Sequence, residues 1–275
     1  MIVLPDAVSP ASGVHAAVMK FPYEDHCGRR QWAAKNNPVP GLDLPALPGY
    51  PMDNINHESG ARMEAKTETL LKALTAQPVI PVMIVESVEH AVPLARALVE
   101  GGLKTLEITL RTDAALDAIK AMTDEIEGAV IGAGTILSAR DYAAAEKAGA
   151  EFIVSPGING DILDAADDSD VPLLPGTATA SEVLSLREEG YRVMKFFPAE
   201  QAGGAPYLKA LSSPIPDVMF CPTGGISLAN APDYLKLPNV ICVGGSWVAP
   251  KDMVVRGDWD GIRKLAEEAC ATLKA

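Results

Sequence analysis

From residue 63 onward, short apolar runs rich in β-branched residues alternate with segments rich in alanine, leucine and charge. Runs of this kind predict buried strands, and apolar positions at helical spacing predict amphipathic helices. The first helix is expected over 64–76, where three leucines recur at helical spacing. Strands are expected at 79–85, 105–110, 129–134, 152–155, 171–174, 192–197, 218–221 and 240–243. Helices between and after them include 89–99, 114–122, 141–148, 180–188 and 262–273.

Eight strand-helix units in about 210 residues are the pattern of a (β/α)8 barrel near the short end of its usual range. The sequence therefore predicts an α/β fold with a single TIM-barrel domain over 63–275, which begins with the N-terminal helix. A doubly wound open sheet is the alternative architecture. In a barrel, the Gly-rich loops after the third, seventh and eighth strands lie on one face, where active sites are built.

Residues 1–62 show neither a helical nor a strand period and hold eight of the 22 prolines. Their Pro- and Gly-rich stretches are typical of turns and extended linkers. A signal peptide is not indicated, because no basic segment precedes an apolar core and prolines interrupt the apolar residues. We expect either an irregular, disordered extension or a translation start assigned too early. We favour the second, with the start at Met52 or Met63.

The chain has 275 residues with 23 basic and 36 acidic side chains, a formal net charge of −13. This acidity argues against nucleic acid and acidic membrane surfaces as partners, because both need a basic face. No apolar run approaches the roughly 20 residues of a membrane span. The cysteines are far apart and form no CxxC pair, which favours small buried thiols in a reducing cytoplasm. They are Cys27, Cys221, Cys242 and Cys270.

Polar residues occupy one face of the second expected strand. Alternation places three apolar residues on one side, against helices, and Glu107, Thr109 and Arg111 on the other. Because a barrel has no edge strand, the polar side is predicted to face the interior. A solvated edge strand is the alternative. In an extended strand Glu107 and Arg111 are about 13 Å apart, too far to neutralise each other, so both are available to a ligand.

Lys195 lies among apolar residues of the sixth expected strand, on the same face as Val193 and Phe197. A buried lysine is disfavoured unless its charge is paired or its pKa falls. Desolvation favours the neutral amine, which is the nucleophile that condenses with a ketone to give a Schiff base. A lysine that reaches water at the strand end is the alternative.

Gly-rich turns follow the last two strands, with Gly224 and Gly225 in the first turn and Ser246 closing the second. Glycines let a ligand approach the backbone closely, and exposed N–H groups with a hydroxyl can hold a phosphate. The loops after strands seven and eight are the usual phosphate site of a barrel. Tight packing is the alternative for either turn alone. Another turn, which ends in Thr135, follows the third strand. No spacing typical of metal ligands is apparent.

Six motifs occur in a characteristic order: EITLRT at 107–112, GAGT at 132–135, SPG at 155–157, KFFPAE at 195–200, CPTGGI at 221–226 and GGSW at 244–247. With them, the chain closely resembles the bacterial 2-keto-3-deoxy-6-phosphogluconate (KDPG) aldolases, also called 4-hydroxy-2-oxoglutarate (KHG) aldolases. The resemblance runs from about residue 67 to the end of the chain. The first 62 residues have no counterpart in it.

The resemblance implies a class I aldolase without metal or other cofactor. It implies cleavage of KDPG to pyruvate and glyceraldehyde 3-phosphate, and of 4-hydroxy-2-oxoglutarate to pyruvate and glyoxylate. Lys195 matches the Schiff-base lysine and Glu107 the general acid/base. The other matched positions bind substrate: Arg111 and Thr135 at the pyruvyl carboxylate, Pro156 at the pocket wall, Thr223 near the substrate with an influence on stereochemistry, and Gly224, Gly225 and Ser246 at the phosphate.

The resemblance further implies a homotrimer that works in the Entner-Doudoroff pathway in the cytoplasm. Alternatives remain open at this point. They include an aldolase for the C4-epimeric galactonate substrate or mainly for 4-hydroxy-2-oxoglutarate, and a phosphosugar isomerase or epimerase that forms no Schiff base. A catalytically silent phosphate-binding barrel is disfavoured, because Glu107 and Lys195 are both expected inside.

Overall fold

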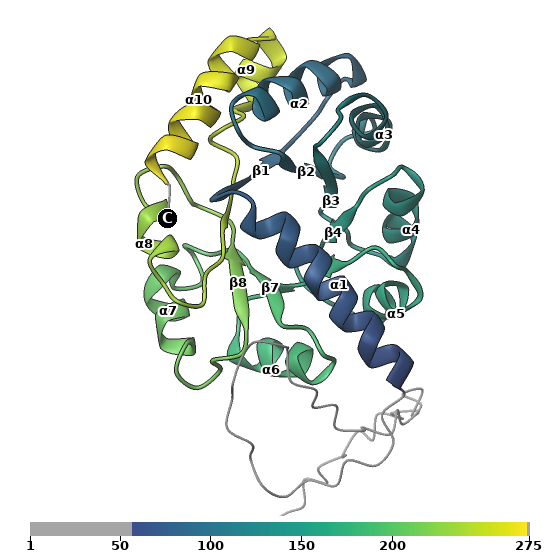
Figure 1. Ribbon diagram of the computed structural model, residues 1–275, viewed down its shortest axis with the longest axis vertical. Helices are drawn as coiled ribbons and strands as arrows, with labels where there is room; N and C mark the ends of the chain where they lie inside the picture. Colours follow the sequence, from purple (N-terminus) through teal and green to yellow (C-terminus); the bar gives the residue numbers. More distant parts are fainter. Residues whose placement is uncertain (1–56, 274–275) are drawn as a thin grey trace, which may run out of the picture. The chain divides into compact units, whose positions relative to one another are not determined.

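The structure is a computed structural model that describes residues 57–273 (Figure 1). Helix α1 (His57–Thr75) begins seven residues earlier than the expected helix at 64–76. Its early turns are held by Arg62, whose guanidinium donates to the carbonyls of Asp167 and Asp168 at 2.8 and 3.0 Å. Contacts this distant in sequence leave no periodic signal, so the helix start was predicted too late. Residues 1–56 of the expected extension lie outside the described residues, and the division at 62/63 stays a prediction.

The alternation of strands and helices predicted from the sequence is present in the described residues. The strands are β1 (Val79–Met83), β2 (Thr105–Thr109), β3 (Val130–Gly134), β4 (Phe152–Val154), β5 (Leu173–Leu174), β6 (Gly176–Thr177), β7 (Val193–Phe196), β8 (Met219–Pro222) and β9 (Val243–Gly245). The further helices are η1 (Val88–His90), α2 (Ala91–Glu100), α3 (Ala115–Glu125), α4 (Ala139–Lys147), α5 (Gly160–Asp168), α6 (Ala180–Glu188), α7 (Gly204–Leu211), α8 (Ala231–Leu235), α9 (Lys251–Arg256) and α10 (Trp259–Thr272).

All strand pairs are parallel, and the strands form a six-stranded sheet, β5-β4-β3-β2-β1-β9, and a three-stranded sheet, β6-β7-β8. Only Pro175 separates β5 from β6 along the chain. Because proline has no backbone N–H, it cannot donate a hydrogen bond to a neighbouring strand at this position. On the other side, isolated parallel bridges join Phe220 to Val240 and Thr223 to Gly244. The α/β class with a curled parallel sheet is confirmed. The continuous eight-stranded ladder of the predicted barrel is not what the pairing shows.

Apolar side chains form two clusters on the two faces of the strands. Leu106 and Ile108 of β2 belong to the larger cluster, which packs between strands and helices. The smaller, inner cluster holds strand residues such as Val193 and also Leu70 and Leu74 of α1. Figure 1 shows α1 lying across the strands, and the Ala73 carbonyl accepts the hydroxyl of Thr105, the first residue of β2, at 2.8 Å. Helix α1 therefore covers the amino ends of the strands.

Two of the four cysteines lie in the inner cluster. Cys221 and Cys242 are free and buried, as expected, whereas Cys270 is only half-buried and Cys27 lies outside the described residues. A hydrogen bond with Cys221 and burial raise the pKa of the Cys242 thiol. The Cys242 thiol therefore stays protonated near pH 7. Among the described helices, none is both long and apolar enough to cross a bilayer.

Candidate active site

Two charged side chains meet in the interior. Glu107, at the centre of β2, is 3% exposed, and Lys195 of β7 is 5% exposed. The Lys195 Nζ lies 3.4 Å from the Glu107 Oε1. Because β2 and β7 belong to different sheets, this contact spans the space between the sheets. The prediction that both residues face the interior is confirmed, and the alternatives of an edge strand and an outward lysine are excluded.

The local sequence fixes the direction of both side chains. In β2 the neighbours of Glu107 face the helices, so alternation turns its carboxylate inward. In β7 the neighbours Met194 and Phe196 do the same for Lys195. The Lys195 backbone is held on both sides, because its N–H donates to the Pro175 carbonyl at 2.8 Å and its carbonyl accepts the Thr177 hydroxyl at 3.1 Å.

The carboxylate of Glu107 lies directly over a glycine of β3. A Cβ atom at Gly134 would lie 2.0 Å from the Glu107 Oε1, a distance that real side chains do not adopt. The GAGT motif therefore provides room for this carboxylate as well as a turn. Phe197 also borders the amine, with its ring centre 5.4 Å from the Lys195 Nζ, within range of a cation–π contact.

Burial has removed most water from the Lys195–Glu107 pair, so each charge depends on the other for stabilisation. A proton that moves from the Nζ to the Oε1 leaves a neutral amine and a neutral carboxylic acid, and the net charge of the site stays the same. The arrangement can thus generate a nucleophilic amine and, beside it, an acid that returns the proton.

The predicted binding residues all lie at the carboxyl ends of the strands. Because the strands are parallel, these ends share one edge, and Lys195 lies near that edge in β7. The residues that follow β2, β3, β4, β8 and β9 there are Arg111, Thr135, Pro156, Thr223, Gly224, Gly225 and Ser246. Gly176, which pairs in register with Lys195, also lies against Pro156, since a Cβ at Gly176 would be 2.3 Å from the Pro156 carbonyl carbon.

Arg111 does not continue the strand as predicted. β2 ends at Thr109, and the Arg111 N–H donates to the Thr109 carbonyl at 2.8 Å, so the chain turns. The exposed Arg111 side chain folds back and donates its Nε–H to the Thr109 hydroxyl at 3.0 Å. The separation of about 13 Å expected between Glu107 and Arg111 assumed an extended strand and does not apply. Alternation along β2 predicts that Thr109 faces inward and assigns it no role.

Thr135, directly after β3, is the one described residue other than glycine with a positive φ, 62°. A β-branched residue in this left-handed conformation is strained, by roughly 1–3 kcal/mol, and such strain is concentrated at functional sites. The sequence motif located the turn but gave no sign of its conformation.

Thr223 carries a buried hydroxyl without a partner. Its Oγ1 has no hydrogen-bond partner among the described residues, and the side chain is 6% exposed. A Cβ at Gly244 would lie 2.2 Å from this oxygen, so glycine makes room for it. An unpaired buried hydroxyl costs about 1–3 kcal/mol, which a ligand could recover by bonding to it.

The turn after β8 is fastened to the loop after β7. Gly224 and Gly225 both adopt left-handed conformations, with φ 104° and 75°. The carbonyls of Thr223 and Gly224 accept the N–H groups of Ala199 and Glu200 at 2.8 and 3.1 Å. Within residues 57–273, the N–H groups of Gly224 and Gly225 donate to no other residue. They are available to an anion, as the exposed Ser246 hydroxyl is.

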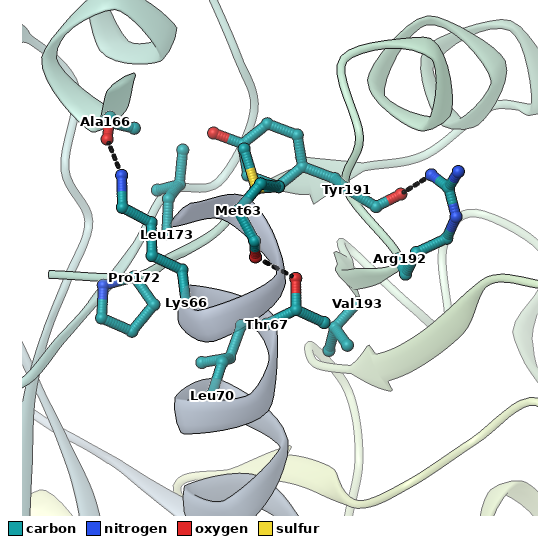
Figure 2. A pocket seen from close by; sticks show the side chains of 10 residues that line it. All are labelled: Met63, Lys66, Thr67, Leu70, Ala166, Pro172, Leu173, Tyr191, Arg192 and Val193. Carbon is teal, nitrogen blue, oxygen red and sulfur yellow. Dashed lines mark hydrogen bonds between the residues drawn. The ribbon is translucent and has the colours of Figure 1, made fainter. Parts of the chain in front are cut away.

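A small cavity lies at the amino ends of the strands, away from this edge (Figure 2). Its lysine, Lys66, donates to the Ala166 carbonyl at 2.6 Å, while Arg62 binds the next two carbonyls at the end of α5. Burial and the nearby Arg62 lower the pKa of Lys66. The open space is about 10 Å³, roughly what one water needs. The two cations cap the C-terminus of α5, and the cavity is too small for a sugar acid.

Comparison with known proteins gives consistent results. A family model described as KDPG and KHG aldolase matches residues 70–265. The 2-dehydro-3-deoxy-phosphogluconate aldolase of Pseudoalteromonas atlantica is 53% identical over 70% of this chain and 90% of that protein. The KHG/KDPG aldolase of Escherichia coli is 50% identical over 71% of this chain and 92% of that protein.

Among solved structures, the KDPG aldolase of Legionella pneumophila, with pyruvate captured as a covalent carbinolamine intermediate, superposes with a TM-score of 0.71 and 43% identity. The match covers 73% of this chain and 97% of that chain.

Proposed function

The chain belongs to the KDPG and KHG aldolase family, and we propose that it cleaves KDPG to pyruvate and glyceraldehyde 3-phosphate through a Schiff base on Lys195. The observation that carries this proposal is the buried contact of 3.4 Å between the Lys195 amine and the Glu107 carboxylate. The carbinolamine captured in the Legionella pneumophila relative is the adduct that an amine and pyruvate form on the way to a Schiff base.

In the first half of the reaction, the neutral Lys195 Nζ adds to the C2 ketone of the substrate. Glu107, which has taken the proton from the amine, returns it to the carbinolamine hydroxyl, and water leaves to give an iminium. Glu107 can reach both the nitrogen and the new hydroxyl because it lies beside the Nζ. A positioned acid/base typically contributes about 10²–10⁴ in rate.

In the second half, the iminium acts as an electron sink. A base removes the C4 hydroxyl proton and the C3–C4 bond breaks. The aldehyde leaves with C4, and C3 becomes a carbon of the enamine. The enamine takes a proton at C3, and water then hydrolyses the iminium to release pyruvate and the Lys195 amine. For these steps Lys195 supplies the amine and Glu107 the carboxylate.

The residues at the carboxyl edge are proposed to hold the two ends of the substrate. Arg111 and Thr135 bind the pyruvyl carboxylate, and Pro156 lines the pocket beside Gly176. Thr223, whose hydroxyl is unpaired, lies near the reacting part of the substrate.

The phosphate is proposed to bind the free N–H groups of Gly224 and Gly225 and the Ser246 hydroxyl. These local donors matter because a chain with a net charge of −13 repels an anionic substrate at long range.

The chain is also proposed to cleave 4-hydroxy-2-oxoglutarate, since its Escherichia coli relative is named for both activities. The phosphate turns favour the phosphorylated substrate. Comparison of the cleavage rates of KDPG, its galactonate epimer and 4-hydroxy-2-oxoglutarate separates these possibilities.

The deciding experiment traps the Schiff base. Borohydride with pyruvate is expected to attach a reduced pyruvyl group to the peptide that contains Lys195, as detected by mass spectrometry. A Lys195→Met protein should neither be labelled nor cleave KDPG. Labelling of another lysine, or normal cleavage by the variant, would overturn the proposal. An isomerase or epimerase that forms no Schiff base would give no label.

We also infer that the two sheets close into one eight-stranded (β/α)8 barrel. Its support is the single residue between β5 and β6 and the contact of Lys195 with Glu107 across the interior. Two parallel bridges add to it, one from Phe220 of β8 to Val240 and one from Thr223, directly after β8, to Gly244 of β9. Cross-strand nuclear Overhauser effects between Phe220 and Val240 in solution would test the closure, and their absence would contradict it.

A homotrimer and a cytoplasmic location are proposed from the family alone. Sedimentation equilibrium tests the first, with three times the chain mass expected. Cell fractionation tests the second, with the protein expected in the cytoplasmic fraction.

A further inference from the structure

Thr109, the last residue of β2, is 1% exposed, yet the reaction proposed above gives it no role. Its hydroxyl lies between two groups. The Oγ1 is 2.8 Å from the Met83 carbonyl at the end of β1 and 3.0 Å from the Arg111 Nε. A hydroxyl has one hydrogen, and a carbonyl can only accept. The Thr109 hydrogen therefore goes to Met83, and a lone pair of the Oγ1 must accept the Arg111 Nε–H.

This contact fixes the guanidinium by one of its nitrogens, Nε. Arg111 has five N–H donors, and the bond to Thr109 uses the one on Nε. Neither Nη nitrogen has a partner among the described residues. The Nη pair is one of the edges that arginine presents to a carboxylate in a two-bond contact. The guanidinium is thus restrained while that edge remains free.

We infer that Thr109 is a positioning residue for substrate binding: its hydroxyl, oriented by the Met83 carbonyl, holds Arg111 so that both Nη nitrogens face the pyruvyl carboxylate. The inference rests on the proposed role of Arg111 in the function above. It explains how an exposed side chain after a turn can keep one orientation without a ligand. Free rotation of a long side chain would otherwise have to be frozen at each binding event.

A purely structural role for the same hydroxyl must be separated from this one. The bond to Met83 also fastens β2 to β1, and a neighbouring threonine provides the matched comparison. The Thr112 hydroxyl donates to the Val85 carbonyl and makes no hydrogen bond to the Arg111 side chain. Thr112→Val thus removes a similar fastening between the same two segments and leaves the arginine alone.

The experiment measures the pyruvate concentration at which borohydride trapping on Lys195 is half-maximal, and the unfolding temperature of each variant. Thr109→Val is expected to raise the half-saturating concentration about tenfold, the scale of one lost hydrogen bond to a charged group. Thr109→Ser, which keeps the hydroxyl, should stay within about twofold of the parent protein on the same scale. Thr112→Val should lower the unfolding temperature without a change in the pyruvate dependence.

An unchanged pyruvate dependence in Thr109→Val would overturn the inference, and so would an equal rise in Thr112→Val, which would indicate a structural effect. If Thr109→Val does not fold, Thr109→Cys replaces it, because a thiol is only a weak acceptor. A second measurement uses an Arg111→Lys background, in which the Nε–H is absent. There Thr109→Val should add no further rise, and an added tenfold rise would refute the coupling. Failure of the parent protein to trap pyruvate would refute the proposed function instead.

Discussion

Gly134→Ala tests whether the position of the Glu107 carboxylate controls the reaction. The new Cβ would lie 2.0, 2.7 and 2.8 Å from the Oε1, Cδ and Cγ of Glu107. Carbon and oxygen atoms need more than 3 Å, so the carboxylate must move by about 1 Å or more. The Glu107 Oε1 now lies 3.4 Å from the Lys195 Nζ. A shift of about 1 Å away from the amine would lengthen this distance beyond that of a hydrogen bond.

A misplacement of about 1 Å at a catalytic group can cost about 100-fold in rate. We therefore expect the kcat of Gly134→Ala for KDPG cleavage to fall about 100-fold on that scale. The fold should survive, because all three crowded atoms belong to a flexible side chain that can rotate away. An assay that couples pyruvate release to lactate dehydrogenase measures the rate, and circular dichroism measures the unfolding temperature.

Gly160→Ala is the matched control. No atom lies within 4 Å of the Cβ built at Gly160, so this variant should keep the parental rate and unfolding temperature. A Gly134→Ala protein with the parental kcat would refute the reasoning. A large loss of unfolding temperature in Gly134→Ala would show that the backbone had moved instead of Glu107.

Three further changes have defined outcomes. Glu107→Gln should retain slow trapping of pyruvate but lose about 10²–10⁴ in turnover, as measured by the coupled assay; unchanged turnover would remove Glu107 from proton transfer. Gly244→Ala would place a Cβ 2.2 Å from the Thr223 Oγ1 and should change the ratio of KDPG to galactonate-epimer cleavage; an unaltered ratio would argue against a stereochemical role for that hydroxyl. Burial alone would raise the pKa of Asp217, but the hydrogen bond and charge of Arg187 lower it. A carboxyl group with a lowered folded-state pKa stabilises the fold above about pH 4 and loses this contribution as the pH falls. Asp217→Asn should therefore unfold at a lower temperature than the parent at pH 7, and the difference should shrink below about pH 4; a difference independent of pH would contradict this.

The sequence predicted which side chains face inward better than it predicted where they meet. Alternation alone predicts that Glu107 and Lys195 face inward, because their apolar neighbours in both strands pack against the helices. Their contact depends on how the sheets curl, which involves residues 88 positions apart in the chain. The left-handed Thr135 and the folded-back Arg111 also escaped prediction, since both depend on turns that carry no hydrophobic period.

Helix α1 has a consequence for the order in which molecules pass through the site. Leu70 and Leu74, 3% and 0% exposed, close the amino ends of the strands, so we expect substrate, products and water to pass at the carboxyl ends, where the proposed binding residues lie. The water that hydrolyses the final iminium must then come in by the path through which the aldehyde leaves. While the aldehyde occupies that path, it shields the enamine from solvent. The chemistry already sets the order of cleavage and hydrolysis, and of pyruvate and aldehyde in the synthetic direction; passage on one side adds that bulk water reaches the final iminium only after the aldehyde has left.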